Sequence, residues 1–150
     1  MKELTGSASA TTTASSDEAM ALLEAIDGYP GWAPDLVKEA EVLERDGDGH
    51  PSRARAKLHV ERGPLTRDFD LLFNVKVEAS GTVALSRVPH ERSDDERFDV
   101  TWRVGGAPQS TRIALELVAN LDVPRFIPLG GVGDSMAADL VSAAKRALGS

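Results

Sequence analysis

LDVPRFIPLGGVGDSMAADLVSAAKRALG, at residues 121–149, is the stretch of sequence that decides the architecture of this chain. Its first part, residues 121–133, contains two prolines and a glycine cluster, and this composition predicts a loop. Beyond the loop, Asp134 or Ser135 can cap a helix that runs to about Leu148. The chain is therefore predicted to end in one long helix, and the rest of the fold must provide a surface that receives it.

The predicted C-terminal helix carries an apolar stripe at helical spacing, formed by Met136, Leu140, Ala144 and Ala147. The charged residues of the same segment lie mostly away from this stripe. A helix of this kind must bury its stripe against another apolar surface. The apolar face of the strands that precede the helix is the only large surface of that kind in the sequence, so the helix is expected to pack there.

The middle of the chain alternates between apolar and polar residues, as half-buried strands do. The pattern is cleanest over residues 52–62, where small and large apolar residues alternate with charged ones. Residues 2–13 are rich in Thr and fit a further strand at a sheet edge. Short turns separate the central candidates and predict an antiparallel meander. These candidates are residues 37–45, 52–62, 68–78, 82–88, 96–104 and 110–119.

The N-terminal part of the chain predicts one helix and then a proline-rich corner. Ser15 or Ser16 can cap this helix, and the two acidic residues that follow suit the positive end of its dipole. The helix ends near Asp27, and YPGWAP follows at residues 29–34. Two prolines forbid a regular helix there, and two aromatic residues indicate a packed corner. A strand-rich middle with a helix at each end is an α+β arrangement, predicted as one domain over residues 1–150.

Composition excludes several classes of function. The formal net charge is -7, which disfavours a nucleic-acid partner or an anionic membrane surface. Cysteine is absent, so a disulfide framework, a thiolate nucleophile and a Cys-ligated zinc are all excluded. The polar N-terminus lacks the apolar core of a secretory signal, and no apolar stretch approaches the roughly 20 residues of a membrane helix. We therefore expect a cytoplasmic protein without stable membrane insertion.

The order of these elements resembles the START-like superfamily, also called SRPBCC, which includes polyketide cyclases, coenzyme Q-binding proteins and lipid carriers. Residues 15–36 (SSDEAMALLEAIDGYPGWAPDL) are similar to the first helix and proline-rich corner of that family. Residues 41–60 resemble its second and third strands, and residues 121–129 resemble the loop that gates its cavity. The resemblance implies a helix-grip fold, in which a curved antiparallel sheet of about seven strands surrounds a long C-terminal helix.

The resemblance also implies an apolar cavity between the sheet and the last helix, which binds a hydrophobic small molecule such as a lipid, quinone or polyketide. Enclosed apolar hollows are the usual form of such sites. For Trp32, packing of the corner against the sheet is an equal alternative. Phe126 belongs to the apolar loop at residues 121–133, which serves as a lid or contacts a membrane surface or partner protein transiently. The expected ligand-binding residues are Trp32, Leu58, Phe69, Leu71, Phe73, Trp102, Phe126, Met136 and Leu140.

Two other functions remain open. One is catalysis, as a polyketide cyclase or aromatase, which requires polar groups inside the cavity to orient the substrate and move a proton. The alternation leaves only Thr82, Ser86 and Thr101 as candidates for such groups, so no catalytic residue is assigned. The other is regulation of a partner protein without a ligand, and a cavity filled by its own side chains would favour it.

Most charged residues are expected to face water. Asp68 and Asp70 share the outer face of their strand, where solvation disfavours a catalytic pair. The histidines lack metal-ligand spacing, so no metal or cofactor is predicted; they are His50, His59 and His90. Three strand arginines are expected to form an outer ion-pair ladder, although an inward one would hold a polar ligand head; they are Arg87, Arg103 and Arg112.

Overall fold

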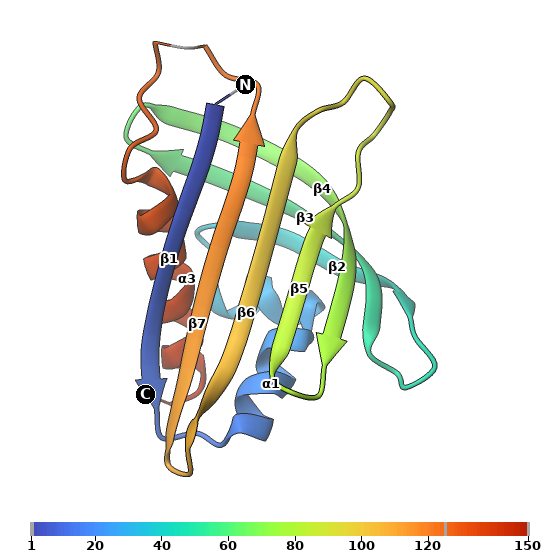
Figure 1. Cartoon of the computed structure of the whole chain (residues 1–150), viewed down its shortest axis with the longest axis vertical. Coiled ribbons are helices and arrows are strands. Elements are labelled where there is room, and N and C mark those ends of the chain that lie inside the picture. The colour runs from blue at the N-terminus through green and yellow to red at the C-terminus, as the bar shows by residue number, and fades with distance from the viewer. Residues whose placement is uncertain (1, 125, 150) are drawn as a thin grey trace.

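Seven strands form one curved antiparallel sheet, and the longest helix lies against its inner face (Figure 1). The computed structural model describes residues 2–124 and 126–149. The strands are β1 (Lys2–Thr12), β2 (Val37–Arg45), β3 (Pro51–Arg62), β4 (Leu65–Glu78), β5 (Thr82–Arg87), β6 (Arg97–Ala107) and β7 (Ser110–Leu121). The helices are α1 (Ser16–Glu24), the short 3₁₀ helix η1 (Ile26–Gly28), α2 (Tyr29–Trp32) and α3 (Val132–Ala147). This arrangement confirms the predicted α+β helix-grip fold.

The first strand pairs with the last strand, as the blue and orange arrows of Figure 1 show. The strand order is β1-β7-β6-β5-β4-β3-β2, and each neighbouring pair is antiparallel. Strands β2 to β7 form the predicted meander. Because β1 and β2 stand at opposite edges of the sheet, the segment that contains α1, η1 and α2 carries the chain from one edge to the other.

The inner face of the sheet is made by the apolar half of each alternating pattern. On β3 the buried residues include Ala54, Ala56, Leu58 and Val60, and on β4 they include Phe69, Leu71, Phe73 and Val75. The register pairs Ala54 with Phe73 and Ala56 with Leu71, so small and large side chains meet across the two strands. The predicted inward faces of both strands are confirmed.

Side-chain hydrogen bonds cap the first helix and join its end to the corner that follows. The Ser15 hydroxyl accepts from the backbone N–H of Glu18 at 3.1 Å, which is the predicted cap of α1. At the corner, the Tyr29 hydroxyl donates to the backbone carbonyl of Leu23 at 2.5 Å. Both Leu23 and Tyr29 are buried, so this bond fixes the single turn of α2 against the end of α1.

Helix α3 begins earlier than the sequence predicted. Its N-cap is Gly131, in the left-handed conformation with φ of 81°, so neither Asp134 nor Ser135 caps it. Asp134 lies in the first turn and accepts a hydrogen bond from the backbone N–H of Ser7 on β1 at 3.0 Å. The sequence prediction placed the cap at a polar residue, whereas the helix begins at a glycine and the polar side chain of Asp134 contacts β1 instead.

The start of α3 packs backbone to backbone on β1. A Cβ atom added at Gly6 would lie 2.1 Å from the backbone carbonyl of Gly133, a distance that no side chain tolerates. Farther along the helix, Met136, Val141 and Ala144 are buried. The predicted stripe is wrong at its end, because Ala147 is exposed where the helix leaves the sheet. Helix α3 therefore lies mainly along β1, with fewer contacts to β7 and few to β3.

Candidate functional site

An apolar cavity lies between α3 and the inner face of the sheet. Its lining comes from η1, α2, strands β2 to β7 and α3. Five of the residues expected to bind ligand line it, namely Leu58, Phe73, Trp102, Met136 and Leu140. Tyr29 of the proline-rich corner lines it as well. Several other lining residues were not among those expected to bind ligand, for example Phe98, Val100, Leu115 and Leu117. All of these come from strands or turns already predicted to face inward, so alternation alone marked them as buried and not as cavity-lining.

The cavity is small. Its volume is about 50 Å³. A water molecule occupies roughly 30 Å³ of the liquid, and sites for drug-sized ligands run from roughly 300 to 1,000 Å³. The side chains therefore fill most of the space that the resemblance implied, and a lipid-sized ligand can enter only if some of them move.

Four of the expected residues lie elsewhere. Phe69 and Leu71 are buried on β4 outside the cavity lining, and the Phe69 ring packs against that of Phe98 with centroids 5.5 Å apart. Phe126 is 84% exposed in the loop before α3. Trp32 is half-buried and lines a groove beside the cavity. Alternation identifies the face of a strand that points inward, and it carries no information about which part of that face the helix leaves uncovered.

Three aromatic rings form a cluster where the cavity meets the corner. Trp32 packs against Tyr29 with ring centroids 4.7 Å apart, and it meets Trp102 edge-on at 6.4 Å. Trp32 therefore packs the corner, which was one of its two expected roles, and it borders the groove beside the cavity and not the cavity itself. Within residues 2–124 and 126–149, the indole nitrogens of both tryptophans are buried and have no hydrogen-bond partner. Buried donors are almost always paired, so these two N–H groups require an explanation.

Tyr29 is the only hydroxyl-bearing or ionisable residue in the cavity lining of the described chain. Burial raises the pKa of Tyr29 far above its ordinary value, and the nearby Trp102 indole opposes this shift more weakly. The indole nitrogen lies beside the hydroxyl without completing a hydrogen bond to it. Tyr29 is therefore neutral, and its hydroxyl already donates its hydrogen bond to the backbone carbonyl of Leu23.

The three hydroxyls proposed for catalysis do not line the cavity. Thr82 and Ser86 flank buried residues of β5 and point to the other face of the sheet, and Thr101 does the same on β6. The chemistry available inside is thus limited to apolar contact, together with the Tyr29 hydroxyl and the indole N–H of Trp102.

A groove of about 190 Å³ opens beside the cavity, between α2, the end of β3 and α3. Leu36 and Leu140 line both hollows and form the partition between them. Arg62 and Asp139 meet as an ion pair in the groove wall, joining β3 to α3. The groove also contains Arg146.

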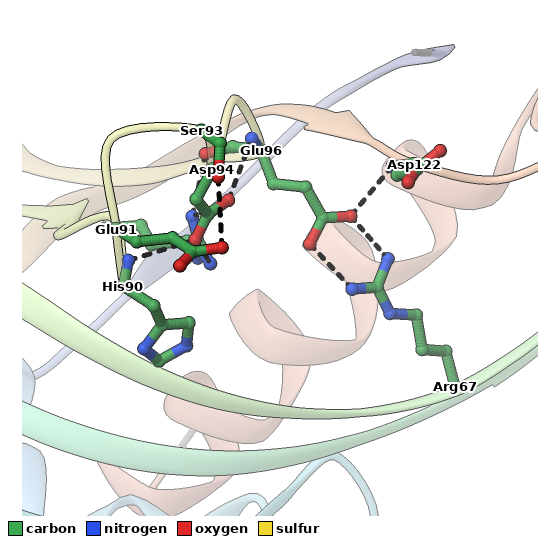
Figure 2. A network of polar contacts seen from close by, with 8 residues as sticks. Arg67, His90, Glu91, Ser93, Asp94, Glu96 and Asp122 are labelled. Carbon is green, nitrogen blue, oxygen red and sulfur yellow. Dashed lines mark hydrogen bonds and ion pairs between the residues drawn. The ribbon is translucent and has the colours of Figure 1, made fainter.

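A second polar cluster joins β4 to the loop between β5 and β6 and to the loop before α3 (Figure 2). The Arg67 guanidinium donates two hydrogen bonds of 2.7 Å to the Glu96 carboxylate, which also accepts from the backbone N–H of Asp122 at 2.8 Å. Arg67 lies on β4, and Asp122 begins the loop before α3. The hydrogen bond with Arg67 lowers the pKa of Glu96. This carboxylate stays ionised and fully partnered, which suits anchoring of the loop better than proton transfer.

Arg87 corrects the prediction of an outer arginine ladder. Its side chain is only 5% exposed and shares the inward phase of Val83 and Leu85 on β5. It donates to the Asp94 carboxylate and to the backbone carbonyl of Glu96, so its charge is closed off from the cavity. The ladder holds elsewhere, because Arg103 pairs with Glu116 at 2.8 Å on the outer face. Arg112 is exposed, as expected.

The remaining polar candidates lie on the outside. His59 hydrogen-bonds Asp68 at 2.5 Å on the exposed face of β3, and this contact raises the pKa of His59. Asp70 pairs with Arg55 on the same face. Across residues 2–124 and 126–149, no group of His, Asp and Glu has the geometry of a metal site. None of the helices in that part of the chain combines the length and apolarity that crossing a membrane requires.

Comparison with known proteins gives one family and many similar structures. The sequence profile of the family described as polyketide cyclase / dehydrase and lipid transport matches residues 12–148. A START superfamily protein from Mycobacterium smegmatis superimposes with a TM-score of 0.79 at 17% identity, covering 97% of each chain. A STAR-related lipid transfer protein from Xanthomonas axonopodis gives 0.65 at 16% identity, covering 96% of this chain and 85% of that one.

A third similar structure is longer than this chain. The di-domain ARO/CYC StfQ from the steffimycin biosynthetic pathway gives a TM-score of 0.64 at 15% identity, covering 95% of this chain and 44% of that one. No curated protein gives a significant match. At these identities the similarity to solved structures is one of fold.

Proposed function

This chain belongs to the polyketide cyclase / dehydrase and lipid transport family, and we propose that it binds and carries a hydrophobic small molecule such as a lipid, quinone or polyketide-like compound. One observation carries the proposal. The hollow between α3 and the sheet is lined by apolar side chains from six strands, with Tyr29 as the single exception among the described residues. Such a lining favours an apolar ligand and offers little to a reaction.

Binding requires the cavity to expand, and α3 is the element best suited to yield. Its N-terminal end is fixed by the backbone contact between Gly6 and Gly133. On the side toward β3, side chains such as Arg62 and Asp139 supply the contact. Met136 and Leu140 line the cavity from α3, and flexible side chains of this kind repack around a guest. The ligand therefore enters on the β3 side and displaces these two side chains.

Filling the cavity tests the proposal. Ala56→Trp places a large side chain in the lining, so uptake of a long-chain alcohol such as dodecan-1-ol, read by native mass spectrometry, should fall at least about tenfold. Ala114→Trp is the matched control, since Ala114 lies half-buried on the outer side of β7. Circular dichroism must show both variants folded. Equal uptake by Ala56→Trp and the wild type would contradict binding in this cavity.

A second function is supported by the small volume of the cavity. A module that regulates a partner protein needs no ligand, and the 84% exposed Phe126 in the loop before α3 offers an apolar contact for a partner or a membrane surface. Folded wild-type protein that takes up no lipid, quinone or aromatic compound would favour this function. The cyclase alternative has less support, because its reaction needs proton-transfer groups that the lining lacks apart from Tyr29.

A further inference from the structure

We propose that the groove beside the cavity is the head-group half of the same ligand site, so that the ligand is amphipathic. Arg62, Arg146 and the Trp32 indole hold an acidic head group, a carboxylate or a phosphate monoester, and the apolar part occupies the cavity. This inference rests on the proposed function, because it takes the cavity to receive the apolar part.

The position of the groove makes it continuous with the cavity. Leu36 and Leu140 line both hollows, and Trp32 in the groove wall touches Trp102 in the cavity wall. Leu140 is only half-buried, so a change of its rotamer would join the two spaces. The two volumes taken together still fall short of the roughly 300 Å³ of a small-molecule site. The joined space nevertheless accommodates a ligand better than the cavity alone.

Two buried donors beside the groove are unpaired. The Nε atom of Arg62 and the indole nitrogen of Trp32 have no hydrogen-bond partner within the described residues. The other two nitrogens of the Arg62 guanidinium are used, one by the backbone carbonyl of Glu61 at 3.0 Å and one by Asp139. A head group with several acceptor oxygens would satisfy donors that the protein leaves open, and buried donors are rarely left so.

The charges in the groove also favour an anionic head group that takes the place of the Asp139 carboxylate beside Arg62. Arg146 lines the groove from α3, and no ion pair links it to another described residue. Asp139 balances Arg62, but its carboxylate is 59% exposed and can rotate into solvent when an anion takes its place. Asp35 also lines the groove and is exposed at its rim, where water screens its charge. Asp139 therefore competes with the head group for the guanidinium of Arg62.

Three ligands with one chain length test this arrangement, namely dodecanoic acid, dodecyl phosphate and dodecan-1-ol. The readout is the intrinsic fluorescence of the full chain, whose two tryptophans, Trp32 and Trp102, border the groove and the cavity. At about pH 8 the acid is ionised, and both anions should bind about tenfold more tightly than the alcohol. Inorganic phosphate alone should bind far more weakly than dodecyl phosphate, because it has no apolar part.

Variants separate the head-group contacts from the apolar ones. Arg146→Gln and Arg62→Gln should each weaken binding of the acid about tenfold and leave binding of the alcohol within about twofold. Asp139→Asn should do the opposite, strengthening acid binding by about threefold or more, since it removes the competitor of the anion. Arg53→Gln is the matched control, because Arg53 lies on the same strand outside the groove and its buried Nε likewise lacks a hydrogen-bond partner, although it lies 3.6 Å from the Glu44 carboxylate.

The outcomes distinguish the two proposals. Equal affinities for acid and alcohol, or no effect of Arg146→Gln and Asp139→Asn, would overturn the head-group site while leaving apolar binding intact. Inorganic phosphate binding as tightly as dodecyl phosphate would overturn the amphipathic ligand. Failure of all three chains to bind would overturn the proposed function as well. If Arg62→Gln unfolds, the other two variants still decide, because a gain in affinity by Asp139→Asn cannot come from misfolding.

Discussion

The pairing of Arg87 with Asp94 shows how single residues can depart from a pattern that is otherwise obeyed. Arg87 has the inward phase of β5, yet its charge never reaches the cavity because the loop that follows β5 folds back and supplies the Asp94 carboxylate. Hydrogen bonds from Arg87, and then from the backbone of His90, hold the pKa of Asp94 well below its usual range. The carboxylate thus stabilises the folded state only while it is ionised.

We expect Asp94→Asn to lower the free energy of unfolding at neutral pH and to make it depend less on pH in the acid range. The pKa of Asp94 is lower folded than unfolded, so its contribution is complete above the ordinary pKa of about 3.8 and is lost as pH falls from there through the folded pKa. Urea unfolding at about pH 7, 4 and 3 measures this. The difference between variant and wild type should shrink as pH falls. A constant difference would contradict the linkage, and Asp95→Asn, at the exposed neighbouring carboxylate, is the control.

At the level of single residues, alternation predicted which side chains face inward and could not predict what they do there. Leu58 and Phe73 were correctly placed at the cavity, whereas Phe69 is buried just beyond it. Phe69 instead packs its ring against Phe98, and the alternation of a strand does not indicate which of its inward side chains will be covered by a neighbour in this way. Arg87 was misread because its partner comes from a loop, whose path depends on turn geometry.

Among the elements, α3 and β1 form the most constrained contact. Their backbones meet at Gly6 and Gly133 with no room for a side chain, and the Asp134 carboxylate bonds the N–H of Ser7 beside them. A strand and a helix rarely approach so closely unless both residues lack Cβ. This contact fixes the end of α3 that must stay in place while the other side opens.

Gly6→Ala should destabilise the fold strongly. The new methyl carbon would lie 2.1 Å from backbone atoms of Gly133, and backbone cannot move aside as a flexible side chain can. We expect a loss of about 3 kcal/mol or more in the free energy of unfolding, measured by urea titration. Gly105→Ala, in strand β6 with nothing within 4 Å of the added carbon, should change it by less than about 1 kcal/mol. Equal effects of the two changes would show that the contact is not close.

The elements themselves were largely predictable, and their ends were less so. Each strand was recognised because one of its faces meets water and the other meets the core. Helix α3 was recognised by its apolar spacing, but its start was placed at Asp134 or Ser135 because these are better capping residues than glycine. Gly131 caps the helix through its left-handed backbone, a conformation that the sequence marks only as a glycine among other glycines.

Across the whole molecule, the partner of β1 and the size of the cavity could not be predicted from the sequence. The pairing of β1 with β7 joins segments that are distant in the chain, and neither segment carries a local mark of the other. Likewise, alternation has the same form for a solid core and for a hollow one. The cavity of about 50 Å³ is the remainder after every side chain has been packed, so only the three-dimensional structure gives it.

Ligand binding should be visible in the stability of the whole molecule. A ligand that binds only the folded state adds about 2.7 kcal/mol at a free concentration one hundred times its Kd. For a domain of this size that corresponds to a rise in Tm of roughly 5–10 °C, measurable by calorimetry with dodecanoic acid or dodecan-1-ol. The rise should be lost in Ala56→Trp and kept in Ala114→Trp. An unchanged Tm at saturating ligand would contradict binding to the folded core.

The pairing of the first strand with the last also sets the order in which the chain can fold during synthesis. Lys2 pairs with Leu121 and Thr12 with Thr111, so β1 leaves the ribosome long before its partner exists. The strands of the meander from β2 to β7 pair with their neighbours in sequence and can assemble as they emerge, whereas β1 can dock only after β7 has been made. The strand made first is thus among the last to find its place, and nascent chains stopped before β7 should hold it exposed to proteases.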